Sequence, residues 1–270
     1  MTGYSLDEIN LPDGQPPKVQ GKLMEYLLHI LGLLGGYWNG ILFYLSIFLF
    51  HSMTPSELQP NLFRHPVVGT FYTSDTQACC DMMVAAYRGG LRFFELLNRG
   101  REVMETFEAL ISTSRTECPE AVLGIGTVMN GIDAARFILK GADFVVSPHI
   151  SAEVGKVCKS SDVYWIPGFL TPTELQAAID LGANMVKLFP GPTVGTAHLV
   201  ALRSIWKEIP VMVSGGVVAS KEGIAPWMAS GANVVAVNMC KICPESWESG
   251  RFDDMEPFFQ SLFFALGATS

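Results

Sequence analysis

The sequence predicts an α/β protein with a (β/α)8 TIM barrel, preceded by an N-terminal apolar helical segment. Short apolar runs and helical stretches alternate eight times after Pro55, which is the order and length expected of such a barrel. Three strand runs directly follow a Gly-Ala pair that ends a helix, at residues 141, 182 and 231. An open doubly wound sheet is the weaker alternative, because no glycine-rich dinucleotide loop follows the first strand.

Strands are expected where short apolar runs rich in β-branched and aromatic residues are bounded by turn residues. The expected strands are 66–72, 92–97, 121–128, 143–148, 164–167, 185–189, 211–214 and 234–238. The expected helices are 76–88, 101–112, 132–140, 151–159, 172–181, 197–207, 221–229 and 255–266. Gly89 and Gly141 end two of these helices, and Thr171 with Glu174 forms a capping box before another.

The N-terminal fifth of the chain differs from the rest. Residues 26–50 include no formally charged residue, and this run exceeds the roughly 20 residues with which a helix crosses a bilayer. We therefore divide the chain into a polar tail at 1–22, an apolar segment at 23–51 and a barrel at 52–270. The apolar segment is interpreted as a membrane anchor, as a hydrophobic helix or hairpin packed on a partner, or as a stretch foreign to the working fold. Acidic residues before it argue against a secretory signal.

Composition and charge exclude several classes of protein. Hydrophobic residues make up 49% of the 270 residues and charged residues 16%, which favours a sizeable core over disorder. The net charge of −8 argues against nucleic-acid binding, which needs a basic face. Six scattered cysteines suit a reducing compartment, cytosolic or plastid-like, with membrane association if the segment at 23–51 is an anchor. Cys240 and Cys243 have redox or half-zinc spacing, but a second ligand pair is missing, so neither a metal nor a cofactor is expected.

Lys187 is the most informative residue for function. It lies in an apolar run, residues 184–190, that is typical of a buried strand. A buried ammonium is costly unless it is paired or loses its proton, and a neutral lysine amine can condense with a carbonyl group. For this window alone, the alternative is a lysine at a strand edge that reaches water.

Glu95 and Arg99 extend the hypothesis of a reactive cavity. Side chains alternate along a strand, which places Lys187 and Phe189 on one face of their strand and Glu95 on the same face as Leu97. A barrel interior that accepts both Lys187 and Glu95 would hold an amine and a carboxylate together, with Arg99 just beyond the strand. The alternative is an ion pair that only fixes packing.

Further candidates lie at the carboxyl ends of strands, where barrel enzymes place their reacting groups. The third strand ends in Gly124-Ile125-Gly126-Thr127-Val128, the fourth in Ser147-Pro148 and the fifth in Pro167-Gly168, each of which is also consistent with a simple turn. Ser214-Gly215-Gly216-Val217 ends the seventh strand. Glycines that lead into a helix N-terminus expose backbone amides suited to phosphate.

These motifs, taken in order, resemble the KDPG/KHG aldolase family (2-keto-3-deoxy-6-phosphogluconate and 4-hydroxy-2-oxoglutarate aldolases). The resemblance rests on Phe94-Glu95-Leu96-Leu97-Asn98-Arg99, Gly124-Ile125-Gly126-Thr127-Val128, Phe144-Val145-Val146-Ser147-Pro148, Ile166-Pro167-Gly168-Phe169-Leu170-Thr171-Pro172-Thr173-Glu174, Val186-Lys187-Leu188-Phe189-Pro190 and Ser214-Gly215-Gly216-Val217. It spans about residues 62–251 and does not cover the apolar segment.

The resemblance implies a homotrimeric barrel and a class I aldolase that needs no metal. Lys187 matches the lysine that forms a Schiff base with pyruvate, Glu95 the proton shuttle, and Arg99 the clamp on the pyruvate carboxylate. The pyruvate pocket is matched by Thr127, Pro148 and Phe189, and part of the phosphate site by Ser214, Gly215 and Gly216. The implied reaction is reversible cleavage of a 2-keto-4-hydroxy acid, of the KDPG or 4-hydroxy-2-oxoglutarate type, to pyruvate and an aldehyde.

The departures from the family lie mainly at the phosphate end. Thr70-Phe71-Tyr72-Thr73 stands where the first strand usually ends in a basic residue, and Asn238-Met239-Cys240 replaces a Gly-Ser loop. His149 replaces the glycine that usually follows Ser-Pro. We therefore expect a non-phosphorylated substrate, such as 4-hydroxy-2-oxoglutarate, or a weaker or different grip on phosphate.

Two other functions compete with the aldolase. A catalytically silent barrel that acts as a membrane-tethered interaction module is favoured by the apolar segment and the altered phosphate end. Retention of Lys187, Glu95 and Arg99 opposes it. A different enzyme on the same barrel, such as a phosphosugar isomerase or decarboxylase, would leave Lys187 without a role.

Overall fold

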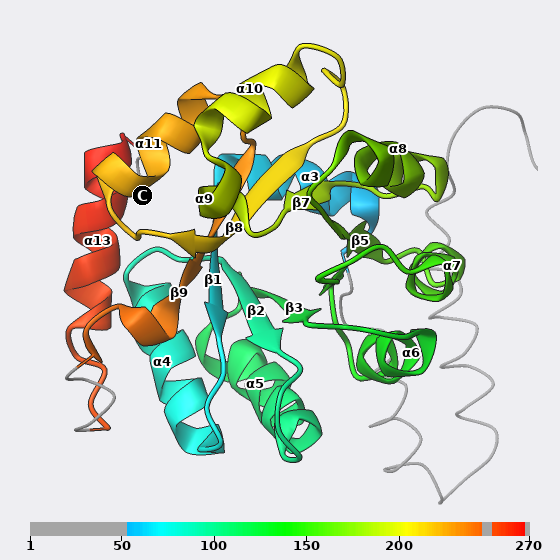
Figure 1. Cartoon of the computed structure of the whole chain (residues 1–270). Helices are drawn as coiled ribbons and strands as arrows, with labels where there is room; N and C mark the ends of the chain where they lie inside the picture. The colour runs from blue at the N-terminus through cyan, green and yellow to red at the C-terminus, as the bar shows by residue number, and fades with distance from the viewer. Residues whose placement is uncertain (1–52, 245–249, 268–270) are drawn as a thin grey trace, which may run out of the picture. The chain divides into compact units, whose positions relative to one another are not determined.

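The computed structural model describes residues 53–244 and 250–267, which fall within a compact unit that spans residues 51–270 (Figure 1). The predicted tail at 1–22 and apolar segment at 23–51 lie outside the described residues. In the described part of the chain, no helix is both long and apolar enough to cross a bilayer.

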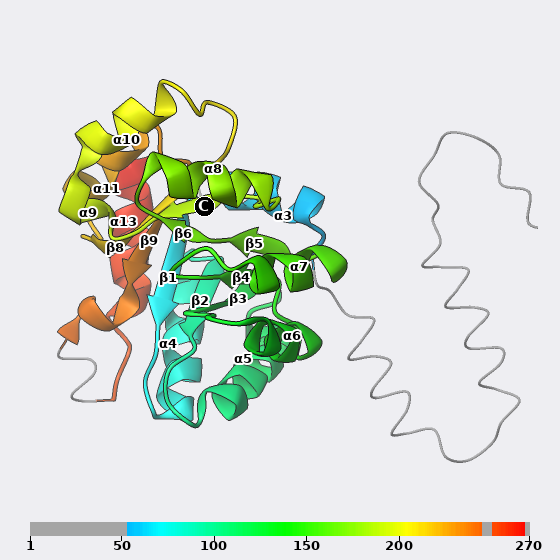
Figure 2. The ribbon, with the colours of Figure 1, turned by 45° about the vertical axis from the view of Figure 1, so that its right-hand side comes forward.

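Nine parallel strands form a nearly closed barrel (Figures 1 and 2). They are β1 (Val67–Phe71), β2 (Phe93–Leu97), β3 (Val122–Gly126), β4 (Phe144–Val146), β5 (Tyr164–Ile166), β6 (Gly168–Phe169), β7 (Val186–Leu188), β8 (Val211–Val217) and β9 (Val234–Asn238). Their order around the barrel is β5-β4-β3-β2-β1-β9-β8-β7-β6, and every pairing is parallel.

The fifth predicted strand, 164–167, corresponds to β5, and a second short strand, β6, follows after Pro167. Proline has no N–H with which to continue a ladder. The residues before it pair with β4, and those after it pair with β7. The same stretch of chain therefore contacts both neighbours and brings the two ends of the sheet together.

Helices follow the strands and cover the outside of the barrel (Figure 1). They are α4 (Thr76–Arg88), α5 (Val103–Glu117), α6 (Gly131–Leu139), α7 (Ala152–Ser160), α8 (Pro172–Asp180), α9 (Gly191–Val194), α10 (Thr196–Arg203), α11 (Lys221–Ala229) and α13 (Met255–Leu266), with a 3-10 turn, η1 (Met239–Lys241), after β9. The capping box predicted from the sequence is present at the start of α8, where it is formed by Thr171 and Glu174.

Apolar side chains fill the barrel interior, and a helix that was not predicted, α3 (Pro55–Arg64), packs against them. Leu58 and Leu62 of α3 belong to the same buried cluster as Phe93, Tyr164 and other inward-facing strand residues. The Tyr164 hydroxyl also donates a hydrogen bond to Gln59 Oε1 at 2.9 Å. Because α3 directly precedes β1, it covers the amino ends of the strands, and the carboxyl ends remain for a site.

Three other elements differ from the prediction. The helix expected at 101–112 continues to Glu117 in α5. The helix expected at 197–207 corresponds to α10 and ends earlier, at Arg203, and the short helix α9 before it was not expected; Gly195, with a φ of 77°, separates the two. The seventh predicted strand continues to Val217 in β8 with an irregular register after Val213.

Candidate active site

A cavity of about 490 Å³ lies at the carboxyl ends of the strands. All nine site residues named from the sequence line it: Glu95, Arg99, Thr127, Pro148, Lys187, Phe189, Ser214, Gly215 and Gly216. The lining is completed by Thr70, Leu97, Val217, Val218, Ala219, Ala236, Asn238, Lys241 and Ile242. Seven of the strands, together with the segments that follow them, thus contribute residues to one space, as expected of a reactive cavity.

Lys187 extends from β7 and is only 5% exposed. Burial lowers the pKa of its amine; the nearby Glu95 carboxylate opposes this shift, and Arg99 adds to it. Its Nζ lies 4.9 Å from the centroid of the Phe189 ring. Within the described residues, no carboxylate forms an ion pair with it. An amine with a lowered pKa and no paired anion has the properties of a nucleophile toward a carbonyl carbon.

Glu95 extends from β2 and is 2% exposed. Burial raises the pKa of its carboxyl group, while Lys187 and Arg99 counteract part of that shift. Its Oε2 atom has no hydrogen-bond partner among the described residues. A carboxyl group with a raised pKa and a free oxygen inside a cavity is suited to moving protons.

Gly126, at the end of β3, provides the space that the Glu95 carboxyl group occupies. A Cβ atom added at Gly126 would lie 1.8 Å from Glu95 Oε1 and 2.6 Å from its Cδ. Any side chain at this position would therefore displace the carboxyl group. Gly126 was named from the sequence only as part of the segment that ends the third strand, and the structure shows that it accommodates a neighbouring side chain.

Arg99 is exposed and directly follows β2. Its guanidinium affects the pKa values of Lys187, Glu95 and Cys240, which places it near all three groups. Among the described residues its side chain forms neither an ion pair nor a side-chain hydrogen bond. The guanidinium fork is therefore available to bind a carboxylate in two-point fashion.

Backbone conformation helps to shape the walls of the cavity. Thr127 has a φ of 59°, in the left-handed region that residues other than glycine rarely adopt, and such strain is common at functional sites. Gly215 has a φ of 91°, and a Cβ there would approach the Phe189 ring and Pro190 Cα at 2.9 Å. Glycine at 215 thus allows the β8 segment to pack against Phe189.

The phosphate end predicted from the sequence is only partly recognisable. Ser214, Gly215 and Gly216 line the cavity, but they lie within β8, and α11 begins only at Lys221. The N-cap of α11 is already occupied, since Ser220 Oγ accepts a hydrogen bond from the Gly223 N–H. His149 is exposed and does not line the cavity.

One charged residue of the cavity, Lys241, was missed by the sequence analysis as a site residue. It ends η1, three residues after β9, and was considered only as part of the Cys240–Cys243 pattern. The available signal was a basic residue one turn beyond the carboxyl end of a barrel strand. In the described part of the chain, no group of three His, Cys, Asp or Glu side chains could hold a metal ion.

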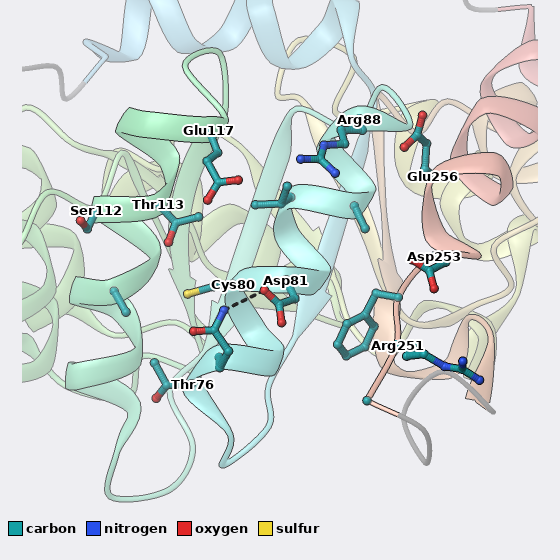
Figure 3. A pocket seen from close by; sticks show the side chains of 16 residues that line it. Thr76, Cys80, Asp81, Arg88, Ser112, Thr113, Glu117, Arg251, Asp253 and Glu256 are labelled. Atoms are coloured by element: carbon teal, nitrogen blue, oxygen red, sulfur yellow. Dashed lines mark hydrogen bonds between the residues drawn. The ribbon is translucent and has the colours of Figure 1, made fainter.

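A second hollow, of about 740 Å³, lies outside the barrel between α4, α5 and the segment that leads into α13 (Figure 3). Its lining mixes both signs of charge, including Asp81, Arg88, Glu117 and Arg251, all of them exposed. Gln77 donates a hydrogen bond to Asp81 at 2.7 Å across one turn of α4. This arrangement is typical of a solvated helix surface, and we assign no chemistry to it.

Comparisons with known proteins identify the family of the chain. The family model "KDPG and KHG aldolase" matches residues 59–256. The chain is 34% identical over 184 residues to the 2-dehydro-3-deoxy-phosphogluconate aldolase of Treponema pallidum (strain Nichols), which covers 68% of this chain and 85% of that protein. It is 28% identical over 153 residues to the KHG/KDPG aldolase of Escherichia coli (strain K12), with 56% and 70% covered.

Solved structures share the fold. A KDPG aldolase from Legionella pneumophila, with pyruvate captured at low pH as a covalent carbinolamine intermediate, matches with a TM-score of 0.69 at 20% identity, covering 78% of this chain and 99% of that one. A thiamine phosphate pyrophosphorylase from Pyrococcus furiosus matches with a TM-score of 0.56 at 15% identity, covering 76% and 96%. Since the family model spans well over half of the sequence, the chain belongs to the KDPG and KHG aldolase family.

Proposed function

We propose that this aldolase is a class I enzyme that cleaves a 2-keto-4-hydroxy acid reversibly to pyruvate and an aldehyde through a Schiff base on Lys187. Family membership supports the lyase class, and the relative trapped as a carbinolamine supports covalent chemistry with pyruvate. The observation that carries the proposal is the buried Lys187 amine, with its lowered pKa, in the same cavity as Glu95 and Arg99.

The reaction begins when the guanidinium of Arg99 binds the substrate carboxylate and so presents the C2 carbonyl to Lys187. The neutral Nζ attacks C2 and forms a carbinolamine. Glu95 donates a proton to the departing hydroxyl group, water leaves, and an iminium remains on Lys187.

The iminium then acts as an electron sink for carbon–carbon cleavage. Glu95, now a carboxylate, removes the proton of the C4 hydroxyl group. The C3–C4 bond then breaks, the aldehyde leaves, and the electrons of that bond form an enamine with the iminium. Protonation of C3 by Glu95 restores the iminium. Water then adds to the iminium and gives its proton to Glu95, and collapse of the resulting carbinolamine releases pyruvate and the free amine, so the water lost earlier is recovered.

Reductive trapping tests the proposal directly. Borohydride added with pyruvate should leave a permanent adduct on Lys187, identified by mass spectrometry of the peptide. Lys187→Met should remove the adduct, whereas Lys159→Met, which alters an exposed lysine of α7, should retain it. Absence of an adduct in folded wild-type protein would refute the Schiff base.

The finer features implied by the resemblance are part of the same proposal. These are a homotrimer and activity without a metal ion. Light scattering after size-exclusion chromatography measures the mass of the assembly, and a mass other than three chains contradicts the trimer. Cleavage rates that fall after exhaustive treatment with a chelator, and return with an added divalent cation, would contradict metal independence. The reducing compartment stays a prediction.

A further inference from the structure

Lys241 is a cation at the cavity for which the reaction above provides no partner. It ends η1 and lines the same cavity as Lys187 and Ser214. Its side chain is exposed, and no described carboxylate forms an ion pair with it. An ammonium group in this position is available to a ligand.

The charges that line the cavity are unbalanced. Arg99, Lys187 and Lys241 are basic and Glu95 is acidic, in a chain whose net charge is −8. The proposed mechanism uses Arg99 for the pyruvyl carboxylate, and Lys187 and Glu95 for covalent chemistry and proton transfer. Lys241 therefore gives the cavity a positive charge beyond that required by the reacting end of the substrate, and clefts of one sign attract ligands of the opposite sign.

Lys241 lies beyond the carboxyl end of β9. Asn238, the last residue of β9, is in register with Thr70 of β1, and Thr70 is in register with Glu95 of β2. Lys241 follows three residues later, at the end of η1, and is exposed, whereas Lys187 and Glu95 are buried. Lys241 is therefore on the solvent side of the reacting groups.

The backbone that carries Lys241 is held in place by several contacts. The Cys240 N–H donates to Asn238 Oδ1 at 2.9 Å, and Cys240 Sγ donates to the Tyr72 carbonyl at 3.5 Å. Met239 is fully buried, and its sulfur occupies the space where a Cβ on Gly69 would lie. The residues that replace the Gly-Ser loop of the family thus hold the short turn that presents Lys241.

We propose that Lys241 binds a negatively charged group at the aldehyde end of the substrate, and so makes this aldolase selective for 2-keto-4-hydroxy acids with an anionic far end. Lysine offers a compact charge and three donors, which suit either a carboxylate or a phosphate ester. The inference rests on the proposed Schiff-base function of the same cavity. It revises the expectation from the sequence that the grip on phosphate is weaker. The Lys241 ammonium takes the place of the backbone amides of the Gly-Ser loop, which this chain lacks.

The test compares kcat/KM for three substrates: KDPG with a phosphate end, 4-hydroxy-2-oxoglutarate with a carboxylate end, and 4-hydroxy-2-oxopentanoate with an uncharged end. Lys241→Met should lower kcat/KM for the anionic substrate that the wild type prefers by about ten- to thirty-fold, mainly through KM, as expected for loss of a charge-assisted hydrogen bond. The uncharged substrate should be affected less than about three-fold, and Lys241→Arg should restore part of the loss. Lys159→Met should match the wild type.

The outcomes separate this inference from the proposed function. Borohydride trapping of pyruvate on Lys187 should be equal in the wild type and Lys241→Met, so a wild type that forms no adduct refutes the Schiff base alone. Binding of inorganic phosphate, measured by calorimetry, then still reports on Lys241 and should weaken about ten-fold in Lys241→Met. Unchanged phosphate binding, or equal losses on charged and uncharged substrates, would overturn the role of Lys241. A larger loss on KDPG than on 4-hydroxy-2-oxoglutarate identifies phosphate as the anion, and the reverse identifies a carboxylate.

Discussion

Replacement of Gly126 by alanine should move the Glu95 carboxyl group while Glu95 itself is retained. The variant therefore tests whether the position of this group matters for catalysis. The added methyl group would lie 1.8 Å from Glu95 Oε1, and real contacts of this kind are essentially never shorter than 3.0 Å, so the oxygen must move by about 1.2 Å. Gly126 does not have a positive φ, and alanine therefore introduces no backbone strain. A misplacement of about 1 Å at a catalytic group lowers the rate by roughly 100-fold, which is the effect we expect on kcat.

The assay is steady-state cleavage of the preferred keto acid, accompanied by exchange of the pyruvate methyl protons with deuterium, which reports on proton transfer to the enamine. Both rates should fall together in Gly126→Ala. Gly131→Ala is the matched control, because its added Cβ would meet its nearest neighbour only at 3.3 Å, on the surface at the start of α6. Wild-type rates in a folded Gly126→Ala would show that the position of the carboxyl group is not critical, and would refute proton transfer by Glu95.

Three further predictions concern pH dependence and stability. Burial lowers the pKa of Lys187 from its ordinary value of 10.5, so the rate of adduct formation with pyruvate should fall as pH decreases through the lowered pKa and should already be at its plateau below pH 10.5; a rate that still rises through pH 10.5 contradicts the shift. Burial raises the pKa of Asp143 to about 7 from 3.8, although the N–H groups of Leu123 and Met53 oppose the shift. The folded state then keeps a proton that the unfolded chain has lost between these two values, so stability should decline as pH rises through that window, by at most about 4 kcal/mol. Denaturation curves of Asp143→Asn should lack this decline, and a parallel pH profile would disprove it. Leu62→Ala in α3, at a site 1% exposed, should lower the free energy of unfolding by about 2–5 kcal/mol in urea while kcat is retained, and a loss below 1 kcal/mol would contradict the packing of α3.

The barrel could be predicted because its elements are local in sequence. Helices α4, α11 and α13 begin and end where the sequence places them, since a capping residue or a glycine marks most of these boundaries. β9 likewise has its predicted bounds. Alternation of strand and helix then leaves few ways to arrange parallel strands, and the strand count favours closure.

The misses have physical causes that lie outside the local pattern. α3 contains Pro60 and has only two fully buried apolar residues, so its sequence resembles a connection; it is a helix because Leu58 and Leu62 pack on the barrel interior. α5 continues beyond its predicted end through residues 113–117, none of which is buried, so no apolar spacing marks this part of the helix. α9 was not predicted because its four residues are too few to show a helical period, and Gly195 separates it from α10.

The same contrast holds for the cavity. Lys187 and Glu95 were found because a charged residue inside an apolar strand is unusual enough to need an explanation. Lys241 was missed because a lysine in a loop is ordinary, and only the three-dimensional structure shows that it lines the cavity. The role of Gly126 could not be seen in the sequence either. This position must lack a side chain because the Glu95 carboxyl group, which comes from the neighbouring strand, occupies the space.

Among the described residues no ion pair joins Lys187 to Glu95, and this leaves both groups available for chemistry. If the two formed a close ion pair, each would stabilise the charge on the other, the amine would stay protonated, and it would have no lone pair with which to attack a carbonyl. In this barrel burial dominates both groups: it lowers the pKa of Lys187 and raises that of Glu95, and the mutual attraction offsets only part of either shift. Apolar side chains, including those of α3, fill the barrel interior and restrict the access of water to it. This favours the burial that shifts the pKa values of Lys187 and Glu95. The apolar core therefore does more than hold the strands together. It shifts an amine and a carboxyl group of one cavity toward their neutral forms, which are the forms that the first step of the proposed reaction requires.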